Sequence, residues 1–240
     1  MTEDEAKKIR TKADSADAPS SHYKLQPGNL GKLIWVTGPP GHGKSTTAHM
    51  FMEKKGYVYY EGDCFVVNLN PFIPPFDGEA LDAMFEQKDL KGLSKERISL
   101  TNASMGAYQK MYAGENFDVE IMNDMYREMS RDIQVQRRRM GGDWAVCQAV
   151  PTRAQRDVIR SILGPELVFV VLEMSKEMGR ERLNKRGHLG EELVRKMEKM
   201  GNAFEPAMED EENAIALKLT RDMTPILVVE KILSNDLLNK

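Results

Sequence analysis

The chain has 240 residues, of which 41% are apolar and 30% charged. The apolar fraction is enough for a folded core, and the length allows one large domain or two small ones. Its net charge of −3 argues against a dedicated nucleic-acid-binding protein, which is usually basic. Two cysteines fit a reducing compartment, and neither a secretory segment nor an apolar stretch of the ~20 residues needed to span a membrane is found, so we expect a cytoplasmic protein.

The first 30 residues differ in character from the rest of the chain. They are polar, nearly balanced in charge and without a sustained apolar period. Such segments bury too little apolar surface to offset the entropy of ordering. We therefore expect residues 1–30 to be a flexible tail and residues 31–240 to form a single domain.

From residue 32 onwards, short apolar runs alternate with helical patterns. Strands are expected at residues 33–37, 57–60, 144–150, 167–172 and 215–219, and helices at residues 45–55, 152–163 and 225–238. Alternation of strands and helices is typical of a parallel α/β sheet.

Residues 64–142 interrupt this alternation between the second and third strands. They contain a proline-rich loop at residues 70–78 and a helical pattern over residues 117–140. In the latter, apolar side chains recur at helical spacing and are expected to pack in the core: Met122, Met125, Met129 and Ile133. The sequence thus predicts a large helical insertion.

Residues 38–45 read GPPGHGKS and satisfy the phosphate-loop motif G-x-x-x-x-G-K-[ST] between a strand and a helix. Glycines let the backbone N–H groups turn toward a phosphate, and the helix N-terminus adds a favourable potential. We expect Lys44 to reach the β- and γ-phosphates of ATP and Ser45 to bind Mg²⁺; the alternative is a glycine-rich turn without a ligand. The predicted nucleotide-binding residues here are Gly38, Gly41, His42, Gly43, Lys44, Ser45 and Thr46.

Other classes of P-loop protein fit less well. A GTPase would need a guanine-reading Asn-Lys-x-Asp late in the chain, and residues 184–187 (NKRG) lack the aspartate. Large oligomeric ATPases carry paired acids after an apolar strand, whereas residues 147–149 (CQA) contain none. The GTPase and motor-ATPase interpretations are both weakened.

Charged residues follow two of the predicted strands. Asp63 follows the second strand, at the sheet edge that carries the phosphate loop. It can accept a proton from an acceptor hydroxyl or hold the Mg²⁺ shell; the alternative is an ordinary turn aspartate. Arg182 and Arg186 are i,i+4 neighbours after the fourth strand and can stabilise charge on a transferring phosphoryl group. The alternative for them is a solvated basic helix.

Short motifs follow the phosphate loop in a fixed order: EGD at 61–63, CQA at 147–149, RD at 156–157, RLNKRGH at 182–188 and FEP at 204–206. In this order they resemble the gluconate kinase branch of the shikimate/gluconate kinase-like small P-loop kinases, over residues 33–63 and 144–206. The resemblance implies a five-stranded parallel sheet in the order 2-3-1-4-5, with ATP–Mg²⁺ as donor. It also implies that Asp63 contacts the acceptor, that Arg182 and Arg186 belong to a mobile lid at about residues 176–206, and that Thr220 lies beside the adenine.

The part of the chain that would receive the acceptor differs from that family. Family members carry a histidine and a short polar helical segment soon after the aspartate, where this chain has residues 64–142, and a serine where it has Gln148. We expect this insertion to select the acceptor. Arg127 and Arg131 share a helix face and are predicted to bind an anionic acceptor, the alternative being a solvated face. The acidic residues 209–212 are expected to form a solvated turn.

The preferred function is transfer of the γ-phosphoryl group of ATP to a hydroxyl of a small polar metabolite resembling gluconate or another sugar acid. A nucleoside monophosphate kinase is an alternative, favoured by the arginine-rich insertion. A second alternative is a non-catalytic nucleotide-binding switch or scaffold. The expected partners are ATP and a small-molecule acceptor, without nucleic acid or membrane.

Overall fold

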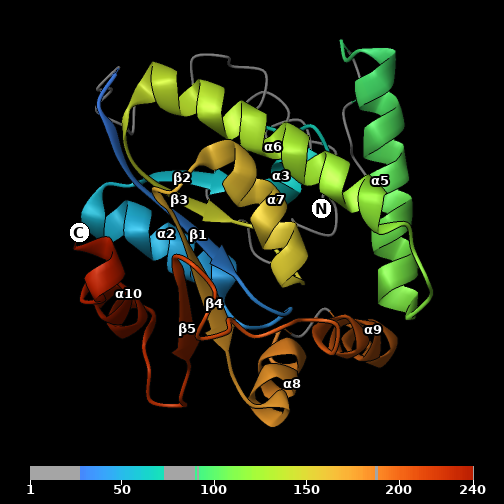
Figure 1. Ribbon diagram of the computed structural model, residues 1–240. Helices are drawn as coiled ribbons and strands as arrows, with labels where there is room; N and C mark the ends of the chain where they lie inside the picture. The colour runs from blue at the N-terminus through green and yellow to red at the C-terminus, as the bar shows by residue number, and fades with distance from the viewer. Residues whose placement is uncertain (1–27, 73–89, 91, 187–188, 240) are drawn as a thin grey trace, which may run out of the picture.

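The computed structural model describes residues 28–72, 90, 92–186 and 189–239. At its centre is a parallel sheet of five strands in the order β2-β3-β1-β4-β5 (Figure 1). The strands are β1 (Leu30–Thr37), β2 (Val58–Glu61), β3 (Gly142–Cys147), β4 (Leu167–Glu173) and β5 (Ala214–Lys218). The fold and strand order are those predicted; residues 1–27 of the expected tail lie outside the described residues.

One strand is shorter than its sequence pattern predicted. β3 was expected to continue to residue 150 but ends at Cys147. The reason is that the N–H of Val150 donates to the side-chain hydroxyl of Thr37 at 2.8 Å rather than to a neighbouring strand. This bond joins the chain that follows β3 to the last residue of β1, directly before the phosphate loop.

Helices cover both faces of the sheet (Figure 1). On one face pack α6 (Val119–Met140) and α7 (Arg153–Leu163), with α5 (Lys95–Ala113) beside α6. On the other pack α2 (Lys44–Lys55) and α10 (Pro225–Leu233). Because β1 lies between two strands and two helical layers, its run Leu33–Val36 is at most 1% exposed, as a central parallel strand requires.

The insertion between β2 and β3 is helical, as predicted. It contains α3 (Gly62–Val66), α5 and α6, while residues 73–78 of the proline-rich loop lie outside the described residues. The methionine stripe of α6 is at most 1% exposed and packs on the sheet, which confirms its expected place in the core.

The remaining helices follow β4 and β5. After β4 come α8 (Lys176–Asn184) and α9 (Glu191–Gly201), and after α10 comes a short 3-10 helix, η2 (Asp236–Leu238). The last helix was predicted to reach residue 238, but α10 ends at Leu233 because Asn235 accepts from the N–H of Leu237 and starts a separate turn.

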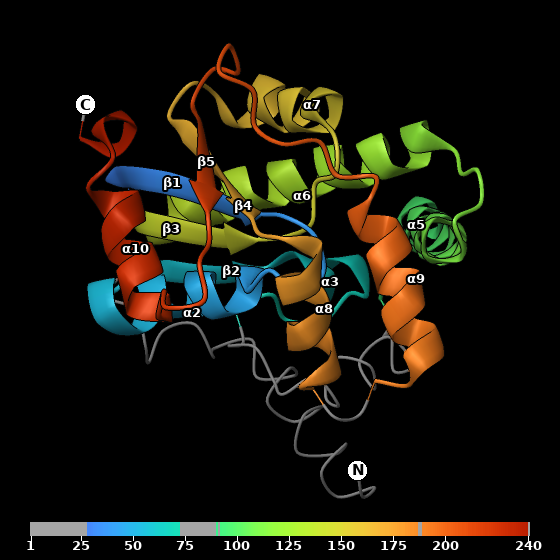
Figure 2. The same ribbon diagram turned by 90° about the horizontal axis from the view of Figure 1, so that it is seen from below.

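Helix α9 lies beside the insertion helix α5 (Figure 2). Lys199 Cδ of α9 is 3.4 Å from the position that a Cβ would take on Gly114, the residue that ends α5. The region predicted as a lid therefore touches the predicted acceptor-binding insertion. Among the helices of the described ranges, none is both long and apolar enough to cross a membrane.

Candidate active site

The loop between β1 and α2 has the backbone shape that phosphate binding requires. Gly38, Gly41 and Gly43 have φ of 146°, 80° and 84°, which residues with a Cβ rarely adopt. At Gly38 a Cβ would also lie 2.7 Å from the carbonyl oxygen of Leu172. Helix α2 begins at Lys44, so its free N–H groups end at this loop. The loop and the helix N-terminus together form a site suited to an anion.

The side chain of Lys44 lies between this loop and an acidic cluster. Its ammonium donates to the carbonyl of Pro39 at 3.2 Å. Burial lowers the pKa of Lys44, while the nearby carboxylates of Asp63 and Glu61 act in the opposite direction. The lysine therefore sits where the phosphate loop meets the carboxyl end of β2.

Two carboxylates follow β2 at that edge. Burial raises the pKa of Asp63, and the charge of Lys44 and a hydrogen bond from Gln148 partly offset this effect. Burial, and then the nearby charge of Asp63, raise the pKa of Glu61 to about 7. Glu61 is 2% exposed. The sequence motif contains Glu61, but no role was predicted for it.

Glu61 leaves one oxygen available. The hydroxyl of Tyr59 donates to Glu61 Oε2, whereas Oε1 is buried without a hydrogen-bond partner in the described part of the chain. In the ionised form of Glu61 this oxygen is free to accept from a donor or to bind a cation.

The predicted metal ligand Ser45 lies beside a thiol. Its Oγ is 3.2 Å from Sγ of Cys147 at the end of β3. Burial raises the pKa of Cys147 well above its usual value, so the thiol is neutral and can donate to Ser45 Oγ. The serine oxygen then keeps a lone pair for a cation.

Together these groups fit Mg²⁺ bound mainly through nucleotide. Ser45, Asp63 and Glu61 supply the hard oxygen atoms that Mg²⁺ prefers. Within residues 28–72, 90, 92–186 and 189–239, no group of three His, Cys, Asp or Glu side chains is placed to hold a metal. Phosphate and water oxygens would complete the shell, as is usual for Mg²⁺ at phosphate sites.

His42, within the loop, is a structural residue. It is 8% exposed, and its Nδ1–H donates to the carbonyl of Leu172 at 2.9 Å. Burial lowers the pKa of His42 to about 4; the hydrogen bond opposes this, and the charges of Lys44 and Arg182 add to it. The ring is therefore neutral at neutral pH and ties the loop to the end of β4.

The structure brings both predicted arginines to the loop. A cavity of about 300 Å³ is lined by the loop, by α8 and the residues after it, and by the β5–α10 connection: Gly41, His42, Gly43, Thr46, Thr47, Arg182, Arg186, Leu219, Met223, Pro225 and Val228. Nη1 of Arg182 lies 3.5 Å from where a Cβ of Gly43 would be. Gly187 and His188 of the same motif lie outside the described residues.

Thr220 is near this cavity but is not one of its lining residues. Its hydroxyl donates to Asp222 Oδ1 at 2.6 Å, while its neighbour Leu219 and the nearby Met223 line the cavity. The apolar side chains of Leu219 and Met223 suit the face of an adenine ring. Contact between Thr220 itself and the nucleotide stays a prediction.

A second cavity, of about 460 Å³, lies between the loop and helices α8 and α9. Its lining includes Pro39 and Pro40 of the loop, Met174, and Met197 of α9. At its edge, Pro39 Cβ is 3.5 Å from the position of a Cβ on Gly201, at the end of α9. Helix α9 thus contacts the phosphate loop as well as α5.

The structure does not bring Arg127 and Arg131 into this cluster. Arg127 donates to Asp124 at 2.6 Å and to Glu120 at 3.4 Å, and Arg131 pairs with Glu128, all on α6. Neither arginine lines either of the two cavities beside the loop. Their role toward an acceptor stays a prediction.

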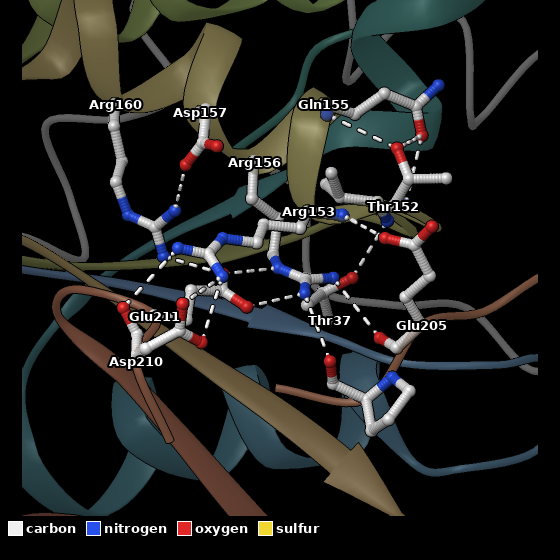
Figure 3. A network of polar contacts seen from close by, with 12 residues as sticks. Thr37, Thr152, Arg153, Gln155, Arg156, Asp157, Arg160, Glu205, Asp210 and Glu211 are labelled. Carbon is white, nitrogen blue, oxygen red and sulfur yellow. Dashed lines mark hydrogen bonds and ion pairs between the residues drawn. The ribbon is translucent and has the colours of Figure 1, made fainter. Parts of the chain in front are cut away.

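The acidic residues 209–212 correct one expectation. They form the expected turn, with Glu209, Asp210 and Glu212 exposed, but Glu211 is buried and accepts from Arg156 at 2.6 and 2.7 Å and from Arg160 at 2.8 Å (Figure 3). Arg156 also donates to the carbonyls of Glu205 and Pro206, both at 3.3 Å. The chain leaving α9 is thereby fixed to α7, a long-range pairing that no local pattern reveals.

No protein-family model matches this sequence, and no curated protein is detectably similar to it. Its fold, however, matches solved structures. A sugar kinase from Janibacter sp. HTCC2649 has a TM-score of 0.57 at 20% identity, covering 85% of this chain and 93% of its own. A gluconokinase from Sinorhizobium meliloti 1021 has a TM-score of 0.53 at 18% identity, covering 86% and 91%. The chain therefore has the P-loop kinase fold.

Proposed function

We propose that the protein transfers the γ-phosphoryl group of ATP to a hydroxyl group of a small polar metabolite of the sugar-acid type. The observation that carries the proposal is the meeting of three groups at one sheet edge. Lys44 of the phosphate loop lies beside the carboxylates of Glu61 and Asp63, with Ser45 on the same loop.

Each group has a part in the transfer. The loop N–H groups and Lys44 bind the β- and γ-phosphates, and Arg182 and Arg186 neutralise charge that builds on the phosphoryl oxygens. Asp63, whose pKa burial raises, accepts the hydroxyl proton as the new O–P bond forms. The bond between Pγ and the bridging oxygen breaks, and ADP leaves.

Ser45, Glu61 and Asp63 would hold Mg²⁺, which supplies positive charge to the phosphates when bound. The unpartnered Oε1 of Glu61 is the feature of this chain that supports the assignment. Glu61 thus joins Ser45 and Asp63 as a residue of the metal side of the site.

The structural matches support a sugar-acid acceptor, since they are described as kinases of sugars or of gluconate.

The test is a screen for ADP release with ATP–Mg²⁺ and a panel of sugar acids, sugars and nucleoside monophosphates. Lys44→Ala should lower kcat about 100-fold or more, because an ordered charge on the phosphates is lost. Lys55→Ala is the matched control, since Lys55 is exposed at the far end of the same helix. Unchanged turnover in Lys44→Ala would rule out the proposed function.

A further inference from the structure

Both long helices of the insertion are hydrogen-bonded to the end of β3. Tyr126 of α6 donates to the carbonyl of Ala149 at 2.7 Å. On α5, the hydroxyl of Tyr108 accepts from Nε2 of Gln148 at 2.6 Å. These tyrosines are 0% and 7% exposed, so the bonds lie in the protein interior. The insertion is therefore tied to the two residues that follow Cys147.

The side chain of Gln148 lies against the residue between the two carboxylates. A Cβ on Gly62 would be 2.6 Å from Gln148 Oε1 and 2.7 Å from its Cβ. Only glycine leaves this space, so the turn from β2 into α3 and the side chain of Gln148 fit together. Gln148 is 1% exposed, and its side chain, packed against the residue directly before Asp63, is hydrogen-bonded to that carboxylate.

A continuous path thus runs from α5 through Tyr108 and Gln148 to Asp63. The amide nitrogen of Gln148 is held by Tyr108 and Asp63, while its oxygen is buried without a hydrogen-bond partner among the described residues. The amide has little freedom to rotate, because a rotation would leave the buried donor unpaired as well. Asp63 is held by this amide and by the start of α3.

We propose that Gln148, itself fixed by Tyr108, is a positioning residue that holds Asp63 in place for the acceptor hydroxyl, and that the insertion acts on catalysis through this link. The inference rests on the proposed phosphotransfer. It gives the insertion a role beyond contacting the acceptor, since α5 helps to set the orientation of the catalytic carboxylate.

The test compares Gln148→Met, Tyr108→Phe and their double variant in the full-length protein. The acceptor is gluconate, or another acceptor that the screen identifies. Gln148→Met keeps the volume of the side chain but removes both donor bonds, and we expect kcat to fall about 100-fold, as for other small displacements of a catalytic group. Tyr108→Phe should lower kcat about 10-fold, consistent with one lost hydrogen bond. The KM for ATP should not change.

The double variant separates positioning from general destabilisation. If Tyr108 acts through Gln148, the double variant is no slower than Gln148→Met alone. Tyr60→Phe is the matched control, because this buried hydroxyl donates to Asp132 of α6 at 2.8 Å and is not part of the path to Asp63. It should match Tyr108→Phe in lost stability and keep wild-type kcat.

Wild-type kcat in Tyr108→Phe, or multiplicative effects in the double variant, would overturn the inference while leaving phosphotransfer intact. A wild-type protein that binds ATP but transfers phosphate to no acceptor would instead overturn the proposed function, and this inference with it.

Discussion

Breaking the buried ion pair between Arg156 and Glu211 should be among the most destabilising single substitutions in this fold. Both side chains are 0% exposed, and the Nε–Oε1 distance is 2.6 Å. Removing Glu211 leaves the Arg156 charge buried without its carboxylate, which costs about 3–5 kcal/mol, whereas removing Arg156 leaves Glu211 its second partner, Arg160, at 2.8 Å. A domain has about 5–15 kcal/mol in total, so Glu211→Gln should remove a large share and Arg156→Met a smaller one.

The lowered pKa of Glu211 gives a second figure for the free energy that its ionised form contributes to folding. Burial alone raises it, but the bonds and charges of Arg156 and Arg160 outweigh burial and lower it from 4.5 to about 2. A carboxylate with a lowered pKa stabilises the fold fully above its unfolded value. That contribution is lost as pH falls from 4.5 toward 2. Because solvent screening is small for a fully buried side chain, the shift corresponds to about 3 kcal/mol.

Denaturant unfolding at pH 7 measures the effect. Glu211→Gln should lose about 3 kcal/mol, or about 10 °C in Tm for a chain of this size, and Arg156→Met should lose less because Arg160 still pairs with Glu211. The double variant Arg156→Met/Glu211→Leu should lose less than the sum of the singles, since apolar residues replace the whole pair. Asp210→Asn is the control, because the Asp210–Arg153 pair is exposed and should contribute little. Losses below about 1 kcal/mol in each single variant, together with a double-variant loss equal to their sum, would show that the pair is not a buried, coupled ion pair.

Two further substitutions test the packing around the site. The pKa of His42 is about 4, so the unfolded chain takes up its proton first, and the contribution of His42 to stability should fall between pH 6.5 and 4. Glu61, with its raised pKa, acts in the opposite direction over part of this range, so the measurement is the difference in stability between wild type and His42→Gln. That difference should change with pH in this range, and a pH-independent difference would contradict the buried neutral ring. Gly62→Ala should lower both stability and kcat because the new Cβ overlaps Gln148, whereas Gly106→Ala, with open space around it, should be neutral or stabilising in its helix. Equal stability of the two alanine variants would argue against the placement of Gln148.

Local patterns predicted much of the fold. The apolar run at the centre of β1 and the glycines of the phosphate loop are read from adjacent residues, because a buried parallel strand and a phosphate loop each impose a local pattern. The buried stripe of α6 follows from helical spacing alone. The order of the strands in the sheet was predicted from the family resemblance of the motifs that follow the phosphate loop.

Pairings across the chain could not be predicted in the same way. Glu211 looks like any residue of a solvated acidic run, and its burial depends on Arg156, 55 positions away in sequence. Gln148 and Tyr108 are 40 positions apart, and although Gln148 belongs to the CQA motif, no local pattern pairs it with Tyr108. Arg127 shows the converse case: its charge suggested a ligand, but an acid three positions earlier is its partner. Local sequence shows which side chains are charged, and only the fold shows which partners they meet.

The position of α9 has a thermodynamic consequence. This one helix touches the phosphate loop at Pro39 and the insertion at Gly114. A helix that contacts both the phosphate loop and the predicted acceptor-binding insertion can couple the binding of ATP to the binding of the acceptor, because a change in its position alters its contacts with both. If the insertion binds the acceptor as predicted and ATP shifts α9 to a position that the acceptor binds with different affinity, the acceptor changes the affinity for ATP by the same factor. Measuring each dissociation constant with and without the other ligand would give that coupling directly.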